Sequence, residues 1–260
     1  MAVISANPTL DYPIGQGHSK LDTLRYLFSY NMDDYVDWIS GTVNFENEEF
    51  TALLEFTNTL PDFYDWDSEG FHSEVDLMRS GQTIIRSTRI DNFNSFLMYK
   101  AIFGGDIVFK GYPAGDRNGN TLMTFPGLAI SSACKDIDGA WAFLRTLLME
   151  ERQYDMTWRQ AFPTNKNAFD RLLADAMDPR LTGGAFGWDG FMVDGRALRQ
   201  DEADTIMSLI ESASGQAGWD ESLWVIISES ASNYFNGLSS VQDTVRVIQN
   251  KASIFIAEQN

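Results

Sequence analysis

Indole rings that stand beside carboxylates are the residues of this chain whose types and spacing could do chemistry. Trp219, Asp220, Glu221 and Trp224 follow one another at the expected start of a helix. Flat apolar rings can lie against the C–H faces of a pyranose, while carboxylates, amides and guanidinium groups bond its hydroxyls. These residue types are those of a carbohydrate-binding site. Further tryptophans fall on expected loops or helix starts, at Trp66, Trp158 and Trp188.

Arg89 and Asp91 form a second candidate pair. They lie in the turn that follows Gln82 to Thr88, part of a β-branched segment (Gln82 to Ile90) that composition predicts to be a strand. Their charged groups could bond the hydroxyls of a ligand. They could equally form an ordinary surface ion pair without a role in binding.

Catalytic patterns are weaker than these binding patterns. The chain has no Gly-x-Ser-x-Gly elbow, no His-Glu-x-x-His and no Gly-x-x-x-x-Gly-Lys, and its two histidines, His18 and His72, stand outside recognised motifs. Adjacent acids such as Glu48 and Glu49 point to different faces of a helix and make no glycosidase pair by themselves. We therefore expect no enzyme, no catalytic residue and no cofactor.

One acidic segment resembles a calcium-binding loop. Asp65-x-Asp67-x-Glu69-Gly70, with Asp76 at the twelfth place, approximates a calcium loop, but its fifth and twelfth residues are unusual for one. A solvated acidic loop without metal is the expectation. The single cysteine, Cys134, excludes an intramolecular disulfide and a cysteine-based zinc cluster.

Composition narrows the classes of partner. With 37 acidic and 19 basic side chains, the formal charge of −18 repels nucleic-acid phosphates and anionic lipid surfaces. We expect no nucleic-acid binding. A chain of 260 residues with 44% hydrophobic residues can bury a substantial core, in one large domain or two small ones. No apolar run is long enough to span a membrane, and no basic-then-apolar leader follows Met1.

The elements that must position these residues are mostly helical. A β-run is expected at Asp106 to Tyr112, and Gly183 to Trp188 is expected to be a flexible aromatic loop. Asn236-Gly237 predicts a left-handed stop between the last two helices. Apolar residues recur at helical spacing in residues 19–30, 47–60, 91–103, 135–148, 167–177, 200–214, 221–235 and 241–258.

Four sequence blocks appear in a specific order. They are GYPxxDxNG at 111–119, GLAISS at 127–132, AWxFLRTLL at 140–148 and FPTNK at 162–166. This order resembles the extracellular solute-binding proteins of bacterial ABC importers, in the broad sugar-binding group that includes maltose-binding protein. The resemblance covers nearly everything from Tyr35 to the end of the chain.

The resemblance implies a fold and a location. The fold would be α/β, type II periplasmic-binding-protein-like, with a helix-rich carboxy-terminal lobe. Residues 1–260 would form a single partial domain that lacks most of the amino-terminal lobe, and residues 121–163 would cross to the other lobe. The full-length parent would be an extracytoplasmic, membrane-anchored lipoprotein, whose signal peptide is absent from this chain. An uncovered sheet edge and the apolar crossing segment would favour self-association of the fragment.

The resemblance also implies a function, the capture of a mono- or oligosaccharide and its delivery to ABC permease subunits by hinge closure. Trp224 falls where relatives place a ligand-stacking tryptophan on the penultimate helix, although it could equally anchor the helical core. The turn at Arg89 and Asp91 matches a cleft-facing turn of the family, but Asp91 stands near a place that often holds an aromatic ring. Trp158 would contact ligand or pack at the hinge.

Two alternatives belong to other classes. The chain could be a carbohydrate-active enzyme or its accessory sugar-binding module, which turnover of a glycan would reveal. It could also be a structural interaction lobe without a ligand, because one scaffold carries many functions.

Overall fold

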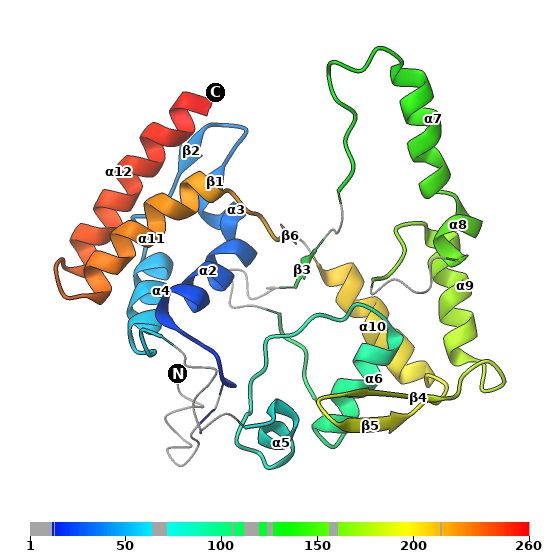
Figure 1. Ribbon diagram of the computed structural model, residues 1–260. Coiled ribbons are helices and arrows are strands. Elements are labelled where there is room, and N and C mark those ends of the chain that lie inside the picture. Colours follow the sequence, from blue (N-terminus) through cyan, green and yellow to red (C-terminus); the bar gives the residue numbers. More distant parts are fainter. Residues whose placement is uncertain are drawn as a thin grey trace. The chain divides into compact units, whose positions relative to one another are not determined.

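The computed structural model describes residues 12, 14–63, 72–105, 107–111, 120–123, 127–155, 161–213 and 215–259. The chain divides into two compact units, each assembled from separate segments. Unit 1 includes Ser73–Val108 and Thr124–Leu209, and unit 2 comprises Tyr12–His72, Phe109–Met123 and Ile210–Asn260. Figure 1 labels the helices and strands of both units.

The molecule is a mixed α/β structure in which helices dominate. This confirms the expected α/β class. Strands in the described residues form three two-stranded pairings, two antiparallel and one parallel. Unit 2 holds α2 (Lys20–Tyr30), α3 (Met32–Tyr35), β1 (Val36–Asp37), β2 (Thr42–Val43), α4 (Glu48–Asn58), β3 (Thr121–Leu122), β6 (Gly215–Gln216), α11 (Glu221–Phe235) and α12 (Val241–Gln259). Unit 1 holds α5 (Glu74–Arg79), α6 (Phe93–Ile102), α7 (Ile137–Leu147), α8 (Glu150–Asp155), α9 (Lys166–Met177), β4 (Ala185–Trp188), β5 (Phe191–Asp194) and most of α10 (Gln200–Ser212).

Side chains that accept hydrogen bonds from first-turn N–H groups fix where the helices begin. Asn47 Oδ1 accepts from the Phe50 N–H at 2.7 Å, and Asp220 Oδ1 accepts from the Leu223 N–H at 2.8 Å. Of the two possible caps in the sequence, Asn44 and Asn47, the structure uses Asn47, and the helices expected at residues 47–60 and 221–235 are confirmed. Similar caps stand at Ser19, Asn92, Asp136 and Asn165.

Aromatic rings fill the core of unit 2. Phe28, Phe45 and Phe50 are fully buried, and the Tyr35 ring stacks on Phe45 with centroids 5.7 Å apart. Apolar side chains of α11 and α12, among them Ile227, close this core from the carboxy-terminal part of the chain. The expected left-handed stop between these two helices is confirmed, because Gly237 has φ 71°.

The side-chain amide of Gln249, on α12, joins the β2 region by two hydrogen bonds. Its Oε1 accepts from the Phe45 N–H at 2.6 Å, and its Nε2 donates to the Val43 carbonyl at 3.0 Å. One amide thus satisfies a donor and an acceptor of an extended backbone that would otherwise need a further strand. The contact ties segments about 200 residues apart.

Residues 185–194 of unit 1 form an antiparallel hairpin, so the expected loop at Gly183 to Trp188 is wrong for Ala185–Trp188, which is strand β4. Asp189 and Gly190 connect the strands with φ values of 49° and 78°, and such two-residue turns favour Asp-Gly because both positions need positive φ. Trp188 and Phe191 pack together with Phe186 against buried residues of α5 and α6.

Residues 83–91 have no regular secondary structure, so the strand expected at Gln82 to Ile90 is absent. Of the strand expected at Asp106 to Tyr112, residues 107–110 have no regular structure and Gly111 forms an isolated bridge, while Asp106 and Tyr112 lie outside the described residues. Strand formation needs a neighbouring backbone to pair with, and β-branched composition alone does not provide one. The loss of the strand at Gln82 to Ile90 leaves Arg89 on an irregular segment.

The helix expected near residues 135–148 is present as α7, but no residue of α7 is buried. Trp141 and Phe143 keep 49% and 66% of their side-chain surface exposed. The apolar side chains of α7 are therefore partly or largely open to solvent. Among the described residues, no helix is both long and apolar enough to cross a membrane.

Candidate functional site

The start of α11 gathers the tryptophans that the sequence singled out. Trp219 and Trp224 lie with ring centroids 5.9 Å apart and planes inclined by 41°. Asp220 stands between them in sequence as the cap of α11, and one of its carboxylate oxygens is used by the Leu223 N–H. Three residues predicted as ligand contacts thus meet at one helix start of unit 2.

The two rings differ in what they offer a ligand. Trp224 is half-buried and packs against the aromatic core of unit 2, as the core-anchor interpretation expects. Trp219 keeps 41% of its surface exposed. Trp219 is therefore the more exposed ring and the better candidate for stacking on a ligand, whereas Trp224 links Trp219 to the core.

Arg25 completes this cluster from α2. Its guanidinium carbon lies 4.0 Å from the centroid of the Trp219 ring, a cation–π distance. The Trp219 Nε1–H donates to Glu221 Oε2 at 3.1 Å. The ring is therefore held over its face by Arg25 and at its nitrogen edge by Glu221. The result is an exposed aromatic surface with guanidinium donors and carboxylate acceptors beside it. We call Arg25, Trp219, Asp220, Glu221 and Trp224 the tryptophan cluster.

The loop before α11 is held close to α2. The Gly218 N–H donates to the Ser29 carbonyl at 2.9 Å, and a side chain at Gly218 would meet Met32 Cε at 2.1 Å. The bond to Ser29 holds the loop against α2, which also carries Arg25, the residue that lies over Trp219. Sequence reasoning missed Arg25, because its helical periodicity marks it only as an exposed position.

The other predicted contacts belong elsewhere. Arg89 and Asp91 lie in unit 1, with Arg89 Nε 3.8 Å from Asp91 Oδ1 and side-chain exposures of 61% and 31%. This is the geometry of a loose surface ion pair. Trp158, and the calcium-like pattern apart from Asp76, lie outside the described residues. Within the described part of the chain, no group of three or more His, Cys, Asp or Glu is arranged to hold a metal ion.

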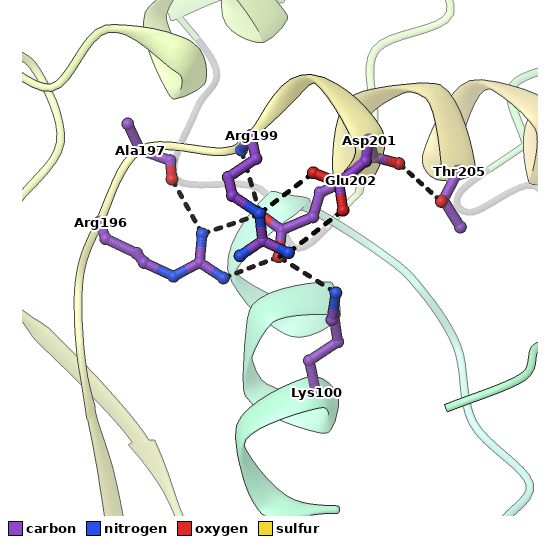
Figure 2. Close-up of polar contacts among 7 residues, drawn as sticks. All are labelled: Lys100, Arg196, Ala197, Arg199, Asp201, Glu202 and Thr205. Carbon is purple, nitrogen blue, oxygen red and sulfur yellow. Dashed lines mark hydrogen bonds and ion pairs between the residues drawn. The ribbon is translucent and has the colours of Figure 1, made fainter. Parts of the chain in front are cut away.

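Unit 1 contains a buried ionic cluster that the sequence did not predict. Glu202, near the start of α10, has a side chain with 0% exposure, and Figure 2 shows it between Lys100, Arg196 and Arg199. Arg196 forms a two-bonded fork with it, at 2.7 and 2.8 Å, while Lys100 Nζ lies 3.2 Å away. The Arg199 N–H adds a further bond at 3.0 Å.

The electrostatic consequence is strong for this carboxylate. Hydrogen bonds from Arg196 lower the pKa of Glu202 to about 2, with further lowering from the Arg199 N–H and Lys100, against the opposing effect of burial. Glu202 remains ionised at neutral pH and joins α6 to the segment that leads into α10. Its oxygens are occupied by protein donors, so the arrangement is that of a structural junction.

Comparison with protein-family models gives no match for this chain, and no curated protein sequence matches it.

Proposed function

We propose that this chain is the carboxy-terminal lobe region of a type II periplasmic-binding-protein-like receptor, which captures a mono- or oligosaccharide for an ABC permease. The parent protein would be an extracytoplasmic lipoprotein. Support comes from the ordered sequence blocks that resemble this family and from the α/β class of the structure.

The single observation that carries the proposal is the tryptophan cluster. An exposed Trp219 ring, backed by Trp224 at 5.9 Å, offers the flat apolar surface that a pyranose needs. Arg25 and Glu221 stand beside the ring with donors and acceptors for hydroxyls. Binding would be non-covalent, and a ligand would favour the closed receptor through its higher affinity for that state.

Arg89 and Asp91, which belong to unit 1, remain separate proposed contacts for ligand hydroxyls. Trp158 remains a proposed contact or hinge residue.

Isothermal titration of the chain with a panel of neutral mono- and oligosaccharides tests the proposal. Saturable heat with one sugar class, lost in Trp219→Ala and retained in Trp141→Ala, would support it. Trp141 is a matched control because it is a similarly exposed tryptophan outside the cluster, on α7. An affinity that Trp219→Ala leaves unchanged, or no binding by this chain and by a full-length parent, would overturn it.

A carbohydrate-active enzyme is the second candidate function, and the same tryptophan cluster favours it as a sugar-binding surface. Chromatography of each glycan after long incubation separates the two. Turnover would point to the enzyme, whereas saturable binding of intact glycan would point to the receptor.

A further inference from the structure

The apolar face of α7 carries an inference that does not depend on sugar binding. Ile137, Trp141, Leu144 and Leu148 recur three or four residues apart, so they line one side of the helix and its end. None of the residues of α7 is buried, and Ile137, Trp141 and Leu148 are each about half exposed. Exposed apolar surface of this extent on one helix is typical of an interaction site.

The charges on this helix have a self-complementary arrangement. Asp138 and Arg145 are separated by seven residues, or two turns, so both lie on the same flank of the apolar stripe. Asp138 is near the beginning of α7 and Arg145 near its end. When two copies of such a helix pack antiparallel about a two-fold axis, like flanks meet and the helix direction is reversed. Each Asp138 then faces an Arg145 across the axis.

We propose that α7 is a self-association surface, which pairs antiparallel with α7 of a second copy of this chain. In this register Trp141 lies next to the two-fold axis, and the stripes interdigitate because their apolar residues fall at alternating heights. Two symmetry-related Asp138–Arg145 pairs flank the apolar contact. The association is through helices, and it needs no free strand edge.

The charges of the chain favour a second copy of α7, and not an anionic membrane, as the partner of this apolar face. Arg145 is the one basic residue in the α7 sequence, whereas helices that bind membrane surfaces are rich in Lys and Arg. The net charge of −18 also repels anionic lipid. In the homodimer, by contrast, the flank of α7 supplies both signs of charge.

The dimer should be weak. A helix of 11 residues is about 16 Å long and covers less than the roughly 800 Å² per partner of a standard interface. Two copies also repel each other through their net charge. We therefore expect dissociation in the micromolar range, with association strengthened by moderate salt because salt screens the net repulsion.

Sedimentation equilibrium over a wide range of protein concentration tests the proposal, with a charge-swap cycle as the decisive part. Asp138→Arg and Arg145→Asp each place like charges opposite each other in the dimer, so each should raise the dissociation constant about fivefold. The double swap, Asp138→Arg with Arg145→Asp, should restore association. Leu144→Asp should abolish it. Far-ultraviolet circular dichroism of each variant controls for loss of α7, because both swaps oppose the helix dipole.

Three results would overturn the proposal. The first is a chain that stays monomeric at every concentration measured, because the proposed dimer should dissociate in the micromolar range. The second is a dimer that Leu144→Asp leaves intact. The third is a double swap that remains as weak as the single swaps although its helix content is unchanged.

Discussion

The guanidinium of Arg25 covers the ring of Trp219 at 4.0 Å, a contact between helix α2 and the loop before α11. A cation over an exposed indole contributes about 0.5–1 kcal/mol. Arg25→Met should lower the free energy of unfolding of unit 2 by that amount, measured in urea. Arg25→Lys should recover part of the loss, since lysine keeps the charge without the planar stack. Equal stability of all three proteins would contradict a stabilising contact.

Glu202→Gln should destabilise unit 1 by about 3 kcal/mol, because it leaves Lys100 and Arg196 without their shared countercharge. Amide hydrogen exchange in α6 and α10 measures this loss locally. Asp201→Asn is the matched control, since Asp201 is an exposed neighbour paired with Arg199 alone. If Asp201→Asn were as unstable as Glu202→Gln, the buried carboxylate of Glu202 would contribute no more to the stability of unit 1 than an exposed one.

Acid should destabilise unit 1 by protonating Glu202. The pKa of Glu202 in the folded state, about 2, lies below its ordinary value of 4.5, so its stabilisation is complete above pH 4.5 and is lost as the pH falls towards 2. The pKa shift corresponds to about 3 kcal/mol at most. Burial raises the pKa of Glu74, which acts in the opposite direction. The stability of Glu202→Gln should therefore fall less steeply with acid than that of the unchanged protein, as urea unfolding at a series of pH values would reveal.

Tyr35 should make unit 2 sensitive to alkali. Burial in the aromatic core, with smaller contributions from Asp34 and Glu49, raises the pKa of Tyr35 to about 12. The unfolded chain releases this proton near pH 10, so the stabilisation is present below pH 10 and is lost between pH 10 and 12. Tyr35→Phe should flatten the fall in stability across that window. Unfolding curves that stay parallel for the two proteins from pH 9 to 11.5 would refute this.

Gln249→Leu should cost about 1–3 kcal/mol, because it leaves the buried Phe45 N–H without an acceptor. Gln242→Leu, the same change at an exposed position of α12, should stay within about 0.5 kcal/mol. Chemical denaturation of the two variants compares them directly. If both lose the same stability, the effect belongs to α12 as a helix and not to the amide contact.

Features that are local in sequence could be predicted. Apolar periodicity and capping residues indicated the helices, and α11 begins and ends where predicted. Trp219, Asp220 and Trp224 were predicted to meet because they follow one another at one helix start. The Asp189-Gly190 pair is a local hairpin signal too, but the prediction of a loop at Gly183 to Trp188 did not use it.

Contacts between distant segments could not be predicted. Arg25 meets Trp219, and Lys100 meets Glu202, across long stretches of chain, and neither pair leaves a periodic signal. The strand predicted at Gln82 to Ile90 failed for the same reason. Its composition suits a sheet, but the presence of a pairing strand is a property of the whole fold.

The hydrogen bonds of Gln249 have a consequence for how the protein is made. A ribosome that adds 5–20 residues per second needs about 10–40 s to travel the 204 residues from Phe45 to Gln249. During that delay the aromatic side chains of α2 and α4 have emerged without the helices that will cover them, while all of Ser73–Leu209 is still being translated. The aromatic core of unit 2 can therefore close only after Ser73–Leu209 has been translated, because α11 and α12 follow that segment in the chain.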